Sequence, residues 1–174
     1  ESHGMAYSAD TLPLDATDLR ILEVLQQDAS LTNQALAEAV HTSPATCLRR
    51  VKRLRDAGVI ERVVAILSPH KLGAGLTALV EVTLDRQGAE HLQAFEARAV
   101  AEPAVQQCYR VSPGPDFVLV VQARDMPDYL ALAQRLFTSD ANVRNVKAFF
   151  SVKRSKFGAQ VPMPLRRPPS AAPG

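Results

Sequence analysis

Apolar residues recur about one helical turn apart in the first third of the chain, between short polar breaks. This pattern predicts amphipathic helices at residues 15–28, 32–40 and 43–57, which pack together through their apolar faces. Asp15 can cap the first helix, because its carboxylate can accept an exposed amide hydrogen of the first turn. Gly58 can end the third helix in the left-handed conformation. The last two helices are joined by a very short turn, so the region is predicted to be a helix-turn-helix unit.

The pattern changes after this unit. Residues 59–67 (VIERVVAIL) are rich in β-branched side chains, which predicts a strand leading out of the helices. Pro69, Gly73 and Gly75 follow and predict a hinge. Residues 157–174 contain five prolines and show no periodicity, so they are predicted to form a disordered basic tail.

The segment between hinge and tail alternates strand and helix patterns. Strands are predicted at residues 76–84, 105–112, 117–123 and 143–152, and helices at residues 88–100 and from residue 125 onward. This βαββαβ order is typical of a ferredoxin-like sheet with two helices on one face. The predicted fold class is therefore α+β.

These predictions divide the chain into five parts. They are a tag remnant and flexible lead-in at 1–13, a helix-turn-helix domain at 14–60, a linker strand and hinge at 61–75, a ferredoxin-like domain at 76–156, and the tail at 157–174.

Charge is distributed unevenly along the chain. The net charge is only +2, yet five basic side chains lie within residues 49–55 of the third predicted helix. Taken alone, such a run is more often a solvated helix face. The short helices around it favour DNA, because the second helix of a helix-turn-helix enters the major groove. Arginine there can read guanine, and serine, threonine and lysine can hold phosphates.

The candidate DNA contacts lie either at the start of this helix or on its basic faces. They are Thr42, Ser43, Ala45, Thr46, Arg49, Arg50 and Arg53. Cys47, Leu48, Val51 and Leu54 are expected on the opposite, packed face.

Three stretches carry a resemblance to a known family. SPATCLRRVKRLRDAGVI (residues 43–60) is similar to the recognition helix of the Lrp/AsnC regulators, residues 14–40 resemble their first two helices, and residues 67–84 resemble their linker and first effector-domain strand. The resemblance runs over residues 14–156. It implies a winged helix-turn-helix that binds double-stranded DNA, followed by a ferredoxin-like effector domain. It also implies dimerisation through the sheet, further assembly that is often octameric, and an amino acid bound between effector domains.

The sequence departs from the family in one loop. Family members carry Val-Ser-Gly-Asp-aromatic-Asp-aromatic between the central strands, whereas residues 111–117 read VSPGPDF. Pro113 and Pro115 each lack an amide donor and have a fixed φ, which puts ligand capture by this loop in doubt. The resemblance nevertheless implies ligand contacts at Gly114, Asp116, Phe117, Met126, Phe149 and Ser151. Asp116 would pair with the ligand's ammonium group, while Phe149 can equally belong to the core of the sheet.

Other chemistry finds little support in the sequence. The histidines are scattered, so we expect no metal site. Cys47 and Cys108 are expected to be small buried side chains. No catalytic arrangement of residues is recognisable, so we expect a protein that has no cofactor and is not an enzyme. Two unpaired cysteines and the lack of a signal peptide or a long apolar run favour the cytoplasm. Two alternatives stay open: a ligand-independent architectural DNA-binding protein of the same fold, and an amino-acid-metabolism enzyme with a regulatory domain.

Overall fold

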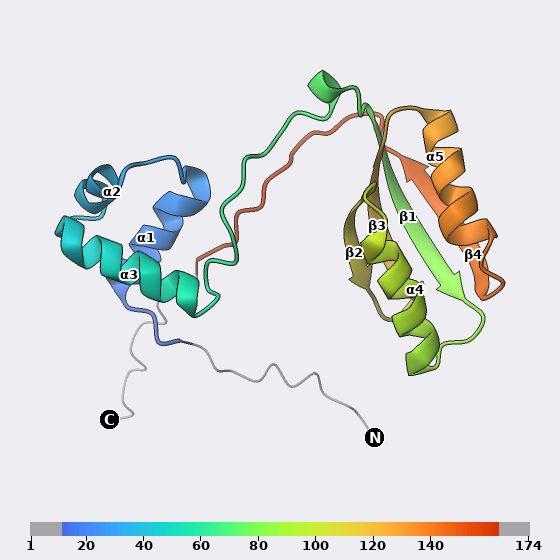
Figure 1. The fold of residues 1–174 in the computed structure, drawn as a ribbon, viewed down its shortest axis with the longest axis horizontal. Coiled ribbons are helices and arrows are strands. Elements are labelled where there is room, and N and C mark those ends of the chain that lie inside the picture. Colours follow the sequence, from blue (N-terminus) through green and yellow to red (C-terminus); the bar gives the residue numbers. More distant parts are fainter. Residues whose placement is uncertain (1–11, 164–174) are drawn as a thin grey trace, which may run out of the picture. The chain divides into compact units, whose positions relative to one another are not determined.

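The computed structural model describes residues 12–163, which fall into two compact units. Unit 1 contains described residues 12–65 together with 157–163, and unit 2 contains residues 66–156 (Figure 1). None of the described helices is both long and apolar enough to span a membrane.

Unit 1 consists of the predicted helices and a small apolar core. The helices are α1 (Ala16–Gln27), α2 (Asn33–Ala39) and α3 (Pro44–Asp56). Each begins at a side chain that accepts an amide hydrogen of the first turn, which confirms the start sites expected from Asp15, Thr32 and Ser43. All three helices contribute to the core, whose buried members are Ile21, Leu36, Ala37, Val40, Cys47 and Leu54.

Unit 2 is the predicted ferredoxin-like arrangement. Its elements are η1 (His70–Leu72), β1 (Leu76–Leu84), α4 (Ala89–Ala101), β2 (Val105–Arg110), β3 (Phe117–Ala123), α5 (Met126–Ala133), the π-helical turn η2 (Gln134–Thr138) and β4 (Val143–Phe150). The sheet order is β2-β3-β1-β4, and every neighbouring pair is antiparallel. The α+β fold class and the βαββαβ order are therefore confirmed.

The two faces of the sheet differ in what covers them. Alternate residues of β1 and β3 are buried against α4 and α5; they include Val80 and Val82 of β1, Leu119 and Val121 of β3, Phe95 of α4 and Leu132 of α5. Leu79 points to the other face, where its register partners are Val120 and Phe149. Leu79 is 44% exposed and Phe149 is 46% exposed, so an apolar face is left open to solvent.

The predicted strand at residues 59–67 is wrong. These residues form no ladder with any described strand, and Val63 and Val64 are 53% and 65% exposed. β-branched residues favour an extended backbone, but a strand also needs a partner edge to accept its hydrogen bonds. Within the described part of the chain, residues 59–67 pair with no strand edge.

The predicted disordered tail is also partly wrong. The amide of Val161 donates to Oε1 of Gln26 in α1 at 2.9 Å, and Nε2 of Gln26 donates to the carbonyl of Val161 at 3.0 Å. Residues 157–163 therefore belong to unit 1. The remaining predicted tail, residues 164–174, and most of the predicted lead-in, residues 1–11, lie outside the described residues.

Candidate DNA-binding surface

A Schellman motif closes α2 and turns the chain toward α3. The amide of Thr42 donates to the carbonyl of Ala37 at 2.9 Å, and the amide of His41 donates to the carbonyl of Glu38 at 3.2 Å. His41 occupies the left-handed position of the motif, with φ of 57°. Because the last carbonyls of α2 are satisfied within the turn, α2 and α3 can be joined by a very short connection.

Hydrogen bonds then hold the start of α3 in place. Ser43 accepts the amide hydrogen of Thr46 at 3.2 Å and donates its hydroxyl to Oγ1 of the same residue at 2.9 Å. Nδ2 of Asn33, at the start of α2, donates to the carbonyl of Pro44 at 2.8 Å. The N-terminus of α3 is thus attached to α2 by side-chain contacts as well as by the turn.

A buried carboxylate attaches the middle of α3 to α1. The side chain of Asp18 is 1% exposed, and its two oxygens accept hydrogen bonds from Nη1 of Arg50 at 3.0 Å and Nη2 of Arg53 at 2.5 Å. Nη1 of Arg50 also contacts Asp15 at 2.6 Å. The backbone amides of Asp15 and Asp18 each donate to the other residue's carboxylate, which completes a capping box at the start of α1.

The protonation equilibria of this cluster follow from its contacts. Burial acts to raise the pKa of Asp18, but hydrogen bonds from the Asp15 amide and from Arg53 and Arg50 outweigh it, so the pKa is lowered. The Asp18 amide and the Arg50 guanidinium lower the pKa of Asp15 to about 2. The same pairing, with Asp15 and then Asp18, raises the pKa of Arg50. All three groups are therefore charged at neutral pH.

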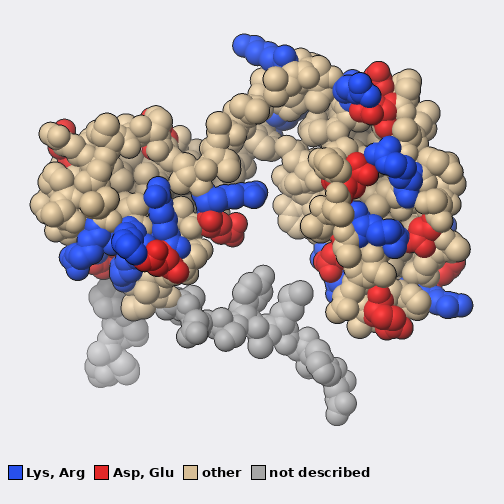
Figure 2. Space-filling view, viewed as in Figure 1, with Lys and Arg blue, Asp and Glu red and all other residues tan. Residues whose placement is uncertain are grey.

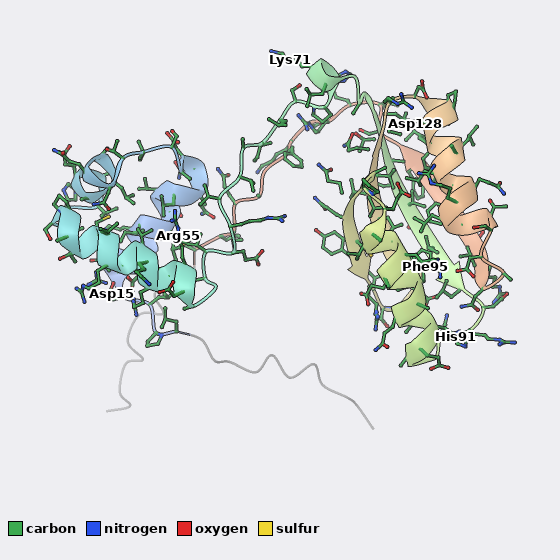
Figure 3. The ribbon with its side chains drawn as sticks, viewed as in Figure 1. Asp15, Arg55, Lys71, His91, Phe95 and Asp128 are labelled. Carbon is green, nitrogen blue, oxygen red and sulfur yellow. The ribbon has the colours of Figure 1, made fainter. Side chains whose placement is uncertain are left out.

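The outer face of α3 combines basic and apolar side chains. Ala45, Leu48, Arg49 and Lys52 are all exposed and follow the i, i+3, i+4, i+7 spacing of one helix face. Arg49 has no ion-pair partner among residues 12–163, whereas Lys52 pairs with Asp56 at 2.5 Å. In Figure 2, Lys and Arg side chains gather over α3 with carboxylates among them, and Figure 3 shows Arg55 and Asp15 near the same helix.

The expected packed position of Leu48 is wrong, because its side chain is 61% exposed and is not part of the core of unit 1. Cys47 and Leu54 are buried and Val51 packs against them, as expected. Leu48 follows Cys47 along the chain, but each residue turns the side chain by about 100° around the helix axis, which takes Leu48 off the packed face.

The predicted DNA contacts thus fall into two groups. Thr42, Ser43, Ala45 and Thr46 lie at the start of α3, and Arg49 lies on its outer face. Arg50 and Arg53 instead reach the buried carboxylate of α1. The sequence showed Asp18 only as a helix-capping partner of Asp15, and nothing in its spacing marked it as the acceptor of two α3 arginines. Lys52 belongs to the basic run but is not among the predicted DNA contacts.

The predicted ligand residues also form two groups, at different positions along the sheet. Phe117 pairs with Val82 near the end of β1, whereas Phe149 pairs with Leu79, and the Ser151 amide donates to Thr77 near the start of β1. Gly114 and Asp116 directly precede β3, and Met126 follows it. A strand advances about 3.3 Å per residue, so along β1 Phe117 lies roughly 10 Å from Phe149 and roughly 16 Å from Ser151, and Phe117 and Phe149 also lie on opposite faces of the sheet. Within one chain, these six residues do not surround one site.

Three of the predicted ligand residues, Asp116, Phe117 and Phe149, already contact other residues of unit 2. Oδ2 of Asp116 accepts the amide hydrogen of Leu84 at 2.7 Å and Nε2 of Gln87 at 3.3 Å. Phe117 is fully buried, and its ring centroid lies 4.9 Å from that of Phe95. Phe149 lies on the open face of the sheet, with Nζ of Lys147 5.1 Å from its ring centroid.

Comparison with known proteins matches both halves of the chain. Residues 14–61 match the family model of winged helix-turn-helix DNA-binding domains, and residues 77–161 match that of the Lrp/AsnC ligand binding domain. The leucine-responsive regulatory protein of Rhizobium meliloti is 37% identical over 85% of this chain and 95% of its own length. The DNA-binding transcriptional activator DecR of Escherichia coli is 35% identical over 86% of this chain and 99% of its own length.

Solved structures agree in fold over most of the chain. The AsnC family transcriptional regulator from Agrobacterium tumefaciens superposes with a TM-score of 0.81 at 31% identity, covering 86% of this chain and 97% of that protein. A Neisseria meningitidis transcriptional regulator in complex with L-Met has a TM-score of 0.79 at 33% identity, with the same coverage of both chains. The chain therefore belongs to the Lrp/AsnC family of transcriptional regulators.

Proposed function

We propose that the chain regulates transcription by inserting α3 into the major groove of an operator, with Arg49 as its principal guanine- or phosphate-contacting arginine. The observation that supports this proposal is that the arginines of α3 differ in their contacts. Arg49 projects from the outer face without an ion-pair partner among residues 12–163, while Arg50 and Arg53 hold α3 against α1. The chain acts by binding, and regulation needs no catalytic step.

Fluorescence anisotropy on duplexes selected from a random pool tests this proposal. Arg49→Ala should weaken binding by about 1–3 kcal/mol if the arginine reads a base, with loss of preference at one position. Arg124, which is exposed and pairs with Asp128 in unit 2, offers a matched control, since Arg124→Ala removes the same side chain elsewhere. Equal affinities of wild type and Arg49→Ala at every salt concentration would remove α3 from the recognition role.

We propose that a second copy of the chain packs against the open face of the sheet. Leu79, Val120 and Phe149 lie together there, and burying such a face against a copy of itself removes apolar surface from water on both sides. Leu79→Lys should reduce the mass in light scattering to that of a monomer. Val100, 67% exposed on α4, is the control, because Val100→Lys places the same charge on an apolar site away from this face. A dimer that survives Leu79→Lys unchanged would exclude this face.

An amino acid bound between chains is the proposed effector, since the predicted ligand residues do not surround one site within a single chain. One carboxylate oxygen of Asp116 is engaged by Leu84 and Gln87, and the other faces no hydrogen-bond donor within the described residues. That oxygen can pair with an ammonium group. Methionine is the first candidate, because the Neisseria regulator was solved with L-Met.

Calorimetric titration with methionine, leucine, phenylalanine and lysine tests the effector. Asp116→Asn keeps an acceptor for the Leu84 amide but removes the charge, so it should weaken binding of an apolar amino acid at least tenfold without loss of folding. Undiminished binding to this variant would exclude Asp116. No binding of any amino acid would favour the ligand-independent architectural protein, a function suggested by the missing amide donors at Pro113 and Pro115.

A further inference from the structure

Leu48 is the one large aliphatic side chain of α3 that takes no part in the core. Leu54 is fully buried and Val51 packs against the core of unit 1, but Leu48 is 61% exposed. Single exposed leucines are common on protein surfaces and need no explanation by themselves. The position of this one matters, because it shares the outer face of α3 with Arg49 and Lys52.

The surroundings of Leu48 restrict what can cover it. Its neighbours on the face are cationic and would repel another basic surface, while they match the phosphates that line a DNA groove. In the major groove, the apolar group offered by the four bases is the C5 methyl of thymine. A leucine carried into the groove beside Arg49 would therefore either cover a thymine methyl or lie against polar base edges without compensation.

We propose that Leu48 is a specificity-determining residue that recognises thymine through its C5 methyl. This inference rests on the proposed insertion of α3 into the major groove. Ala45, on the same face, offers only one methyl group, so the longer side chain of Leu48 makes the main apolar contact. The operator half-site should accordingly contain a thymine whose methyl contributes to affinity, within a base pair or two of the position contacted by Arg49.

Uracil substitution isolates this contact, because uracil differs from thymine only by the missing methyl. A duplex selected by the wild-type protein from a random pool is prepared in versions with one thymine at a time replaced by uracil. Wild type should lose about fourfold in affinity at one half-site position, the loss expected for one buried methyl group. Leu48→Ala should bind the thymine and uracil versions of that duplex equally.

Leu130 of α5 gives a matched control, since it is 59% exposed and Leu130→Ala makes the same change in unit 2. That variant should keep the uracil effect. Light scattering and a melting curve of Leu48→Ala should match wild type, because the side chain is largely exposed.

The outcomes separate this inference from the proposed function. Wild-type binding that is insensitive to uracil at every position would overturn the role of Leu48 and leave DNA binding intact. An undiminished uracil effect in Leu48→Ala would assign the methyl contact to another side chain. A changed mass of Leu48→Ala without any change in uracil sensitivity would place Leu48 at a contact between copies instead. Failure of wild type to select any duplex would overturn the proposed function itself.

Discussion

Removing the carboxylate of Asp18 should destabilise unit 1 strongly, although the residue is not itself a candidate DNA contact. Its side chain is 1% exposed and accepts hydrogen bonds from Arg50 and Arg53 of α3 and from the amide of Asp15. Asp18→Ala would leave two guanidinium groups facing each other without their shared counter-ion. It would also remove two of the ion pairs that join the start of α1 to α3, and leave Arg50 paired with Asp15 alone.

The exposure of the partners sets the size of the effect. Breaking a buried ion pair by removing one member costs about 3–5 kcal/mol when the other charge stays buried. Arg50 and Arg53 are 23% and 41% exposed, so water can partly rehydrate them. We therefore expect a loss near the lower limit, about 3 kcal/mol, which lowers the melting temperature of a small domain by roughly 12–24 °C.

Differential scanning calorimetry of the full chain measures this loss, and hydrogen exchange followed by mass spectrometry assigns it to the amides of α1 and α3. Asp56→Ala is the control, because Asp56 also pairs with a cation of α3, Lys52, but is 63% exposed. Exposed pairs contribute about 0–1 kcal/mol, so this variant should melt within a few degrees of wild type. Equal effects of the two substitutions would refute the reasoning, since burial would then make no difference.

The structure supports further predictions of stability and local contact. His41→Gly should stabilise unit 1 by about 0.5–1 kcal/mol in thermal melts, because glycine adopts the positive φ of the Schellman turn without a Cβ clash; a lower melting temperature would contradict this. Since the pKa values of Asp15 and Asp18 are lowered by folding, their contribution is present above about pH 4 and is lost as the pH falls toward the folded value, about 2 for Asp15. An acid titration of the melting temperature should therefore be shallower for Asp18→Ala than for wild type. Gln26→Ala should speed hydrogen exchange at the amide of Val161, and an unchanged rate would mean that the hydrogen bond is not formed in solution.

The sequence was sufficient wherever one local rule determined the structure. The starts of α1, α2 and α3 were predictable because Asp15, Thr32 and Ser43 are capping side chains placed just before apolar helical patterns. The sheet of unit 2 was predictable because β1 and β3 (LTALVEVTL and FVLVVQA) are short apolar runs rich in β-branched residues. In both cases the information lies within a few residues of the element itself.

The predictions were wrong or incomplete where the outcome depends on distant partners. Residues 59–67 have the composition of a strand, but whether they form one depends on pairing with an edge, and they pair with none among the described residues. The candidate ligand residues do not form one set within a chain, because the register between β1, β3 and β4 places Phe117 and Phe149 three residues apart along β1 and on opposite faces of the sheet. Pairing register cannot be read from the separate strands.

The basic run of α3 shows why a count of charges does not identify a DNA contact. Arg49 and Arg50 are adjacent in sequence, but their side chains leave the helix about 100° apart, so that one points outward and the other reaches Asp18. A loss of DNA affinity in Arg50→Ala would therefore not identify a base contact, because the substitution also loosens α3 from α1. A residue is identified as a base contact only if its substitution weakens DNA binding and leaves the melting temperature at the wild-type value. Leu48 and Arg49 meet the structural condition for that result, since both side chains are exposed and neither has an ion-pair partner within residues 12–163.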